Sequence, residues 1–404
     1  MASATAPHTV VLTSPQSHPA RPGSARRLRW AVPAVALVAV AGAVALPQLA
    51  TADPADLAPR SAAQLLVDLS QNRTSSLSGT VVQTSRLGLP ELPGAAARTT
   101  GPLSLASGSN TLRVWADGPD RSRVALMGQL AEYDVVRSGR DVWTYSSQRN
   151  EAVHYTLPRD AASPGHPGEP GRAVAKAGHT LRDPMAPGQM LPGALLPSTP
   201  AAAADAVLAL VDPSTSVTVE ENVTVAGRGA RQLVLTPRDS SSLMGSVRLA
   251  VDAETSTPLR VQVFAAADRE RPAFEVGFTN VTFAAPKASV FAFTAPPGAR
   301  TREVTVPAMA RHGKTTVGSA KDLPAGKGSG ARPTIVGEGW TSIVALEGVD
   351  VTALAEAQPE LLTQLTTRVP EGRVLKTALL TVLITDDGRV LVGAVPVEAL
   401  RAAA

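Results

Sequence analysis

The chain has 404 residues, of which 44% are hydrophobic and 18% charged, and its net charge is +4. This length and hydrophobic content suffice for about two domains, each with a core of its own. Only 6 of the 38 basic residues are lysines and no basic cluster interleaves with aromatic residues, so the composition argues against binding of nucleic acid. Cysteine is absent, which excludes disulfides, thiol nucleophiles, cysteine-based zinc sites and the lipidated cysteine of a bacterial lipoprotein.

The N-terminal region carries a membrane-targeting pattern. Residues 1–29 are typical of a disordered cytoplasmic arm, with arginines close to its end. Residues 30–46, WAVPAVALVAVAGAVAL, are free of charge and 17 long, about the minimum for a bilayer span. Because basic residues stay cytoplasmic, we expect the rest of the chain outside the cell membrane. We favour a retained single-pass anchor, while a signal peptide cleaved after Ala52, in the pattern ATA, stays open and would give a secreted protein.

Residues 58–300 are expected to form one domain that begins with a helix. The segment APRSAAQLLVDLSQ has apolar residues at helical spacing, namely Ala62, Leu65, Leu66 and Leu69. Short runs with a period of two follow, among them NTLRVWA, RSRVALMG, EYDVVRS, DVWTYSS and AVHYTL. Turn sequences such as DGPD and SGRD separate these runs, so we predict an antiparallel meander.

A proline-rich insertion divides the strands into two groups. Residues 158–200 hold nine prolines and no sustained periodicity, which predicts a long loop or lid. A second helix follows, with one face formed by Ala204, Val207, Leu208 and Val211, and then strands resume. Apolar residues change from even to odd positions between Phe278 and Val281, which predicts a bulge near Asn280.

One antiparallel sheet with this many strands is not expected to stay flat and open. We predict an α+β fold in which the sheet curls into a half-open β-barrel with the two helices on its concave side. Residues 308–334 form a polar linker, and residues 335–404 a small C-terminal α+β unit. That unit is expected to contain a helical region from 351 to about 367 and a hairpin turning at Asp387 and Gly388. About 70 residues give a marginal core, so we expect the unit to pack on the main domain.

No catalytic or metal-binding pattern emerges. The chain has no H-E-x-x-H and no G-x-S-x-G, and His154 is the only histidine within an expected strand. We interpret His154 as a solvated strand residue. The acidic turns DAET and TDDG are more typical of turn hydrogen bonding than of glycosidase chemistry. We therefore predict no cofactor and no enzymatic activity; hydrolysis of a glycan or lipid that depends on His154 is kept as a third hypothesis.

The aromatic residues gather in two regions. Five of the seven Trp and Tyr residues lie between Trp115 and Tyr155, and all six Phe residues lie between 264 and 293. One interpretation is an ordinary core between sheet and helices; the other is that part of the concave face is unfilled and holds an apolar ligand. On the second interpretation, the candidate cavity residues are Trp115, Trp143, Tyr145, Tyr155, Phe264 and Phe278.

Several segments occur in an order that is similar to a known family. They are GPDRSRV, SGRDVWTYSSQRNEAVHY, LAVDAETSTPLRVQV and FEVGFTNVTFAAPKASVFAFTAPPGA, all between residues 58 and 299. In order and spacing they resemble the LolA-like superfamily, which includes outer-membrane lipoprotein carriers and MucB/RseB-type envelope-stress regulators. With the N-terminal anchor and the segments GWTSIVAL and LLTVLITDDGRVLVGAV, the chain looks like membrane-anchored proteins of this type from actinobacteria. The resemblance implies a half-open β-barrel closed by helices that binds acyl chains without catalysis.

Two hypotheses from different classes remain open. The first is a non-enzymatic, extracytoplasmic protein that binds the acyl chains of a lipid or lipoprotein and is attached to the inner membrane. The second is a regulatory module in which the sheet edge or the C-terminal unit holds a membrane-protein partner, such as an anti-sigma factor or a transporter.

Overall fold

The computed structural model describes residues 57–71, 76–89, 100–157, 196–209, 211–305, 332–347 and 363–404. All of these lie in one compact unit, Ala52–Ala404, and Met1–Thr51 is a separate unit. The predicted arm and membrane segment lie outside the described residues, as do most of the proline-rich insertion, most of the linker and most of the helical region from 351 to 367. None of the helices in the described part of the chain is long and apolar enough to cross a membrane.

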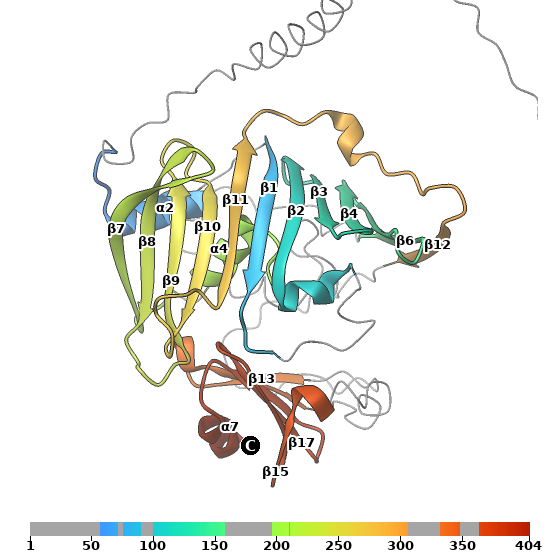
Figure 1. Ribbon diagram of the computed structural model, residues 1–404. Coiled ribbons are helices and arrows are strands. Elements are labelled where there is room, and N and C mark those ends of the chain that lie inside the picture. Colours follow the sequence, from blue (N-terminus) through green and yellow to red (C-terminus); the bar gives the residue numbers. More distant parts are fainter. Residues whose placement is uncertain are drawn as a thin grey trace, which may run out of the picture. The chain divides into compact units, whose positions relative to one another are not determined.

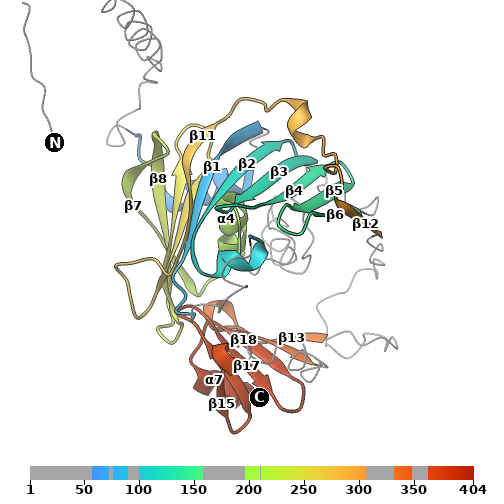
Figure 2. The same cartoon turned by 45° about the vertical axis from the view of Figure 1, so that its right-hand side comes forward.

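Most of the described chain is β-structure, and twelve strands form one large curled sheet that is not closed into a barrel (Figures 1 and 2). The predicted curl is therefore confirmed. Along the sheet the strands lie in the order β12, β6, β5, β4, β3, β2, β1, β11, β10, β9, β8 and β7. Their bounds are β1 Ser76–Ser85, β2 Gly108–Asp117, β3 Arg121–Met127, β4 Glu132–Ser138, β5 Asp141–Ser146, β6 Glu151–Thr156, β7 Thr215–Val225, β8 Arg228–Pro237, β9 Met244–Asp252, β10 Pro258–Ala265, β11 Phe274–Thr282 and β12 Arg300–Thr305.

The pairing follows the predicted antiparallel meander in two runs. Strands β2 to β6 pair in sequence, as do β7 to β11, and β1 joins the runs by pairing with β2 and β11. Strand β12 is the exception, because it pairs in parallel with β6 at the edge of the sheet. A parallel pair needs a long connection, and here the chain between the two strands includes the whole second run.

A bulge interrupts β11 where the sequence predicts one. Thr80 pairs with Asn280, whereas the next residue, Val81, pairs with Phe278, so β11 has one extra residue at this point. The Asn280 side chain accepts a hydrogen bond from the backbone N–H of Thr80 at 3.2 Å. Opposite the bulge, a Cβ on Gly79 would lie 2.4 Å from the Asn280 carbonyl oxygen, so the close approach of the backbones requires glycine. Bulges of this kind increase the twist of a sheet.

Two helices lie against one face of the sheet, which we call the inner face (Figures 1 and 2). Helix α2 (Ala62–Gln71) packs on β7, and helix α4 (Pro200–Leu208) packs on β10 and β11. A capping box starts α2: the Ser61 hydroxyl accepts from the N–H of Gln64, and the Gln64 side chain accepts from the N–H of Ser61. Thr199 caps α4 by accepting from the N–H of Ala202.

The C-terminal part forms a second sheet with six strands in the order β13, β14, β18, β17, β16 and β15. One face packs against helix α7 (Val397–Ala403) through a core that includes Val374, Leu383, Leu391 and Leu400. The predicted hairpin is β17 and β18, and Gly388 in its turn has a φ of 88°, which favours glycine. The strand bounds are β13 Arg332–Val336, β14 Ile343–Glu347, β15 Thr367–Val369, β16 Gly372–Lys376, β17 Thr381–Thr385 and β18 Val390–Gly393.

Trp340, which precedes β14, contacts the start of β7. Its indole N–H donates to the Thr215 hydroxyl at 2.8 Å, and the ring is buried in the hydrophobic core of the large sheet. Its neighbour Gly339 has a φ of 60°, and a Cβ there would lie 2.2 Å from the Ser214 hydroxyl. Two backbone hydrogen bonds also join the C-terminal part to the domain of the large sheet. The N–H of Leu243 donates to the carbonyl of Ala394, and the N–H of Ala378 donates to the carbonyl of Leu87.

We expect Trp340→Ala to destabilise residues 52–404 by about 3–5 kcal/mol, because it removes a buried ring and leaves a cavity. Trp340→Phe keeps an aromatic ring but removes the donor to Thr215, so its cost should be smaller, about 1 kcal/mol. Urea unfolding, followed by far-UV circular dichroism, measures both. Equal midpoints for wild type and Trp340→Ala would contradict this role.

Candidate functional site

The inner face of strands β2 to β5 is an apolar surface built from cross-strand rows. Residues that pair directly across strands share a face, so the register fixes which side chains lie together. One row consists of Val114, Val124 and Val135, and a second consists of Leu112, Leu126 and Tyr133. The rows continue onto β1 at Val81, opposite Leu112, and all these residues belong to one hydrophobic core.

The two described helices cover the other half of the inner face. Helix α4 packs on β10 and β11 and α2 on β7, whereas neither has more than marginal contact with β3 to β6 within the described residues. The inner side chains of β3 and β4 are nevertheless buried, with Val124 and Val135 each 2% exposed. The half of the sheet formed by β3 to β6 thus carries apolar side chains that are buried without packing on α2 or α4.

Polar side chains on the inner face are engaged in internal hydrogen bonds. Gln83 and Ser85 of β1 both donate to the carbonyl of Leu105, which belongs to the short helix η2 (Pro102–Ala106). Asn110 of β2 donates to Gln83 and to the carbonyl of Ser104. Within the described part of the chain, the buried side-chain atoms without a hydrogen bond are Arg248 Nε and Glu371 Oε2, neither of which lies on this inner face.

Two titratable residues are buried on the inner face of β4. Burial raises the pKa of the Tyr133 hydroxyl, which therefore stays neutral at ordinary pH. Burial lowers the pKa of Arg137, whose guanidinium pairs with Asp120 at 3.3 Å and donates to the carbonyl of Gly139. Arg137 is thus held at the end of its own strand by partners in two turns.

The outer face of the same strands is covered by residues 283–299, which we call the strap. The strap connects β11 to β12 and contains the short helix η5 (Ala288–Phe291), which packs on β3 and β4 (Figure 1). Phe293 of the strap lies against two aromatic residues of β5, with ring centroids 5.2 Å from Trp143 and 6.0 Å from Tyr145. The strap gives this half of the sheet a second buried face, because Ala125, Val136 and Ala152 point outward and are at most 1% exposed.

The register separates the six predicted cavity residues into two groups. Tyr155 pairs with Val142, and Phe278 with Val81, so both lie on the inner face with the core. Four lie on the outer face and so do not line the inner face as predicted. They are Trp115, which pairs with Arg123; Trp143 and Tyr145, which contact the strap; and Phe264, which lies under the guanidinium of Arg248.

His154 is the residue that the sequence interpretation placed least well. Its side chain is only 17% exposed, and its ring stacks on Trp143 with centroids 4.3 Å apart and planes 8° apart. Nδ1 lies 2.6 Å from a carboxylate oxygen of Glu303, and Nε2 lies 2.9 Å from one of Asp141. The sequence could not indicate this because Glu303 is on β12, which is 149 residues away along the chain.

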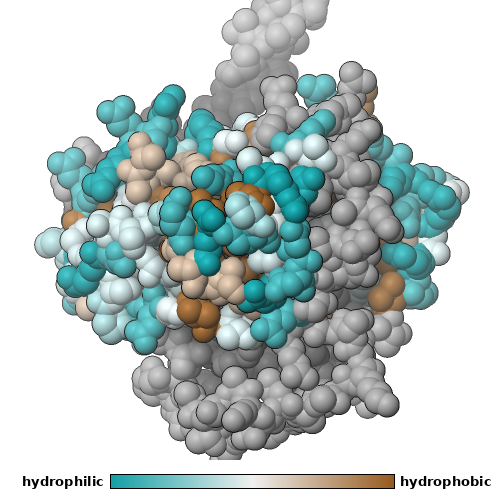
Figure 3. Space-filling model, turned by 90° about the horizontal axis from the view of Figure 1, so that it is seen from below, coloured by the Kyte–Doolittle hydropathy of each residue, from teal (hydrophilic) through white to brown (hydrophobic). Residues whose placement is uncertain are grey.

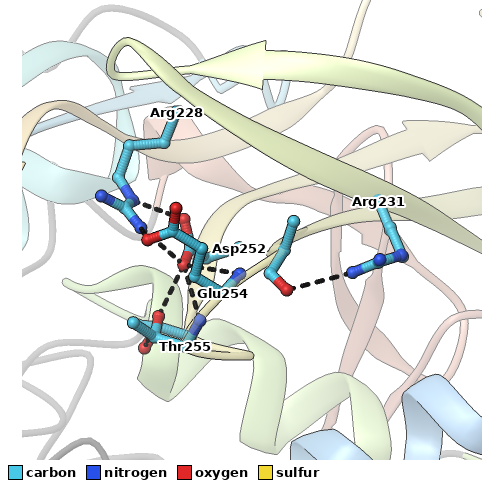
Figure 4. Close-up of polar contacts among 7 residues, drawn as sticks. Arg228, Arg231, Asp252, Glu254 and Thr255 are labelled. Carbon is cyan, nitrogen blue, oxygen red and sulfur yellow. Dashed lines mark hydrogen bonds and ion pairs between the residues drawn. The ribbon is translucent and has the colours of Figure 1, made fainter. Parts of the chain in front are cut away.

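A cluster of charged residues fixes the end of the sheet at the turn between β9 and β10. Figure 4 shows Arg228, Glu254 and Thr255 gathered around Asp252, which is 1% exposed. Arg228 donates to both carboxylate oxygens of Asp252, and Thr255 donates to Asp252 through its backbone N–H and its hydroxyl. Burial by itself raises the pKa of Asp252, but these hydrogen bonds outweigh it and hold the pKa below its ordinary value.

The same cluster positions two segments beside the sheet. The Arg228 guanidinium lies 4.8 Å over the ring of Phe283, where the strap begins. Arg231, which lies beside this cluster in Figure 4, donates to the carbonyl of Ala58, just before α2, and to the carbonyl of Ala253. The charges at this turn therefore have a structural role. No group of three or more His, Asp or Glu side chains suited to a metal ion occurs among the described residues.

No protein-family model and no curated protein sequence matches the chain. Solved structures similar to it include the MucA/MucB complex of Pseudomonas aeruginosa, at 17% identity over 84% of this chain and 96% of that one, with a TM-score of 0.39. A LolA superfamily protein from Nitrosomonas europaea is 11% identical over 58% of this chain and 99% of that one, with a TM-score of 0.22. The resemblance to LolA-like proteins is thus also found among solved structures. At these TM-scores the similarity assigns no ligand, partner or activity to the chain.

We expect Asp252→Asn to cost about 3–5 kcal/mol at neutral pH, because it leaves the Arg228 charge without its buried partner. The pKa of Asp252 is lowered in the folded state, so its stabilising contribution is present above the unfolded value of about 3.9 and is lost as the pH falls through the folded value. The variant should therefore lose less stability than wild type between neutral pH and the acid range.

Urea unfolding at several pH values measures this difference. Asp268→Asn, at an exposed turn carboxylate that also accepts backbone hydrogen bonds, is the matched control and should change stability much less. An acid dependence that is unchanged in Asp252→Asn would contradict the assignment.

Proposed function

We propose that this chain is a non-enzymatic, extracytoplasmic protein that binds the acyl chains of a lipid or lipoprotein against the inner face of its curled sheet. The observation that carries the proposal is the set of apolar rows on the inner face of β2 to β6, against which neither α2 nor α4 packs to more than a marginal extent. On this proposal the curled sheet acts as a half-open barrel. The strap occupies the outer face of the same strands, so the ligand is proposed to enter on the inner face, among side chains that are already buried.

The chemistry of the inner face suits an uncharged chain. Its rows consist of Val and Leu, with Tyr133 neutral and the amide and hydroxyl groups of β1 engaged with η2. Burying an acyl chain supplies about 0.8 kcal/mol per CH2 group, so a chain of ordinary length needs no charged anchor for affinity. Of the predicted cavity residues, Tyr155 remains a candidate for this contact, whereas Phe278 lies on β11, against which α4 packs.

The absence of catalysis is part of the proposal. His154 lies on the outer face of the large sheet, away from the inner-face rows. Both of its ring nitrogens are engaged with carboxylates, so neither faces the proposed ligand. A measurable hydrolysis of lipid or glycan that is lost in His154→Gln would contradict this part.

Attachment to the inner membrane is proposed from the sequence, where four arginines precede the apolar run of residues 30–46. Determining the N-terminal residue of protein purified from membranes tests it. A protein that starts at Asp53, rather than at Met1 or Ala2, would indicate a cleaved signal peptide instead of an anchor.

The matched substitutions Tyr155→Ala and Tyr145→Ala test the ligand-binding face. Both residues are half-buried tyrosines on neighbouring strands, but Tyr155 lies on the inner face and Tyr145 on the outer face against Phe293. We expect Tyr155→Ala to weaken lipid binding about 30- to 150-fold, because truncating an aromatic side chain removes about 2–3 kcal/mol of apolar contact. Tyr145→Ala should leave lipid binding close to wild type.

Residues 52–404, purified without detergent from a secreting host, provide the measurement by comparison of native and denaturing mass spectrometry. A released species of lipid mass in wild type and in Tyr145→Ala, reduced in Tyr155→Ala, is the expected result. Wild-type protein that carries no lipid and takes none up from vesicles would contradict the proposal.

The regulatory module remains the second candidate, favoured by an exposed apolar group on the C-terminal sheet. Ile335 of β13 is 66% exposed and pairs directly with Val344 of β14, which is also exposed. Figure 3 views the molecule from below the orientation of Figure 1, and on this face hydrophobic residues lie in small groups among hydrophilic ones. A stoichiometric membrane-protein partner, such as an anti-sigma factor or a transporter, that is lost in Ile335→Glu but kept in Tyr155→Ala would favour this candidate.

A further inference from the structure

Strand β12 is held at the edge of the sheet with little help from apolar burial. Its side chains from Arg300 to Glu303 are exposed, and Val304 is half-buried. Its backbone pairs with β6 over six residues, from Arg300 opposite Glu151 to Thr305 opposite Thr156. The side-chain contact described between the two strands is that of Glu303 with His154. When apolar burial is small, one charged hydrogen bond is a large part of what holds a strand.

Each ring nitrogen of His154 has a carboxylate partner. Nδ1 and Nε2 each lie within hydrogen-bond distance of a carboxylate oxygen, on Glu303 and Asp141 respectively. Ionised carboxylates only accept hydrogen bonds, and a neutral imidazole has one N–H to donate. Both contacts are therefore satisfied together only when the ring carries two protons and a positive charge. The stack on the face of Trp143 also favours the cationic ring.

The groups that face the ring come from three elements. Strand β5 contributes Asp141 and, one row away, Tyr145, whose hydroxyl donates to Asn150. Strand β12 contributes Glu303, and the strap contributes the uncharged ring of Phe293, which lies on Trp143. On β6 itself, Ala152 and Thr156 share the outer face with His154 and carry no charge. Loss of the proton thus leaves two carboxylates beside a neutral ring with one donor.

We propose that His154 is a proton-controlled latch on β12. With the ring protonated, Glu303 and Asp141 are both bonded and β12 is held on β6; with the ring neutral, two carboxylates compete for one N–H, and in the tautomer that keeps the bond to Asp141 the bond to Glu303 is lost and β12 separates more often. Separation exposes the backbone N–H and C=O groups along the edge of β6, which then becomes available to another extended segment. The latch rests on the outer-face geometry and does not depend on lipid binding at the inner face.

Amide hydrogen exchange on the full chain, in detergent micelles, tests the latch. Exchange is measured at about pH 5.5 and about pH 8, on either side of the range in which histidines ordinarily titrate, and is corrected for the intrinsic effect of pH. We expect protection of residues 300–305 to fall about two- to fivefold at the higher pH, because a largely exposed ion pair contributes up to about 1 kcal/mol. Protection in β11 should stay constant and serves as the internal reference for folding.

Glu303→Gln removes the charge from an exposed side chain without shortening it. In this variant, protection of β12 at low pH should fall toward the wild-type value at high pH, and the dependence on pH should shrink. Arg302→Gln, one residue earlier and on the opposite face, is the matched control and should keep the wild-type dependence. Equal protection of β12 at both pH values in wild type, or a full pH dependence in Glu303→Gln, would overturn the proposal.

Discussion

The strict alternation of side chains along paired strands is the constraint on which the large sheet depends. Because strands β1 to β6 pair with one another without a register shift, each row of side chains runs unbroken across several strands on one face. One row runs from Val114 through Val124 to Val135 on the inner face, while the adjacent outer row runs from Trp115 through Arg123 and Val136 to Trp143 and His154. A shift of one residue would exchange these rows, so register decides which chemistry faces the helices.

The outer row explains why β5 carries two large aromatic residues, Trp143 and Tyr145. A sheet whose inner face forms the core needs no large apolar residues outside unless something covers them. The strap supplies that cover, since Phe293 lies on Trp143 and Tyr145 and η5 lies on β3 and β4. The aromatic residues of this region therefore hold the connection from β11 to β12 in place, and β12 in turn adds the parallel edge strand.

The sequence predicts local features well where a local signal exists. Alternating apolar residues predict the strands of both runs, and apolar residues at helical spacing predict α2 and α4. The change of apolar residues from even to odd positions after Phe278 predicts the bulge. Period two also shows that Trp143 and Tyr145 share a face, but it does not say which face points toward the helices. The parallel pairing of β12 has no local signal, because its partner β6 lies about 150 residues earlier and the pair has no turn between them. The burial of His154 has no local signal for the same reason, because its partner Glu303 lies on β12.

The two halves of the inner face differ in the elements that pack against them. In the half formed by β7 to β11, helix α4 brings small residues, Ala203 and Ala204, close to the sheet, so the space there is filled by the protein itself. In the half formed by β2 to β6, comparable apolar rows face inward without a described helix, and the strap has already closed the other side. The rows of β2 to β6 are nevertheless buried as fully as those of β7 to β11, with Val124 and Val135 each 2% exposed, so α2 and α4 account for the packing of one half of the inner face and not of the other.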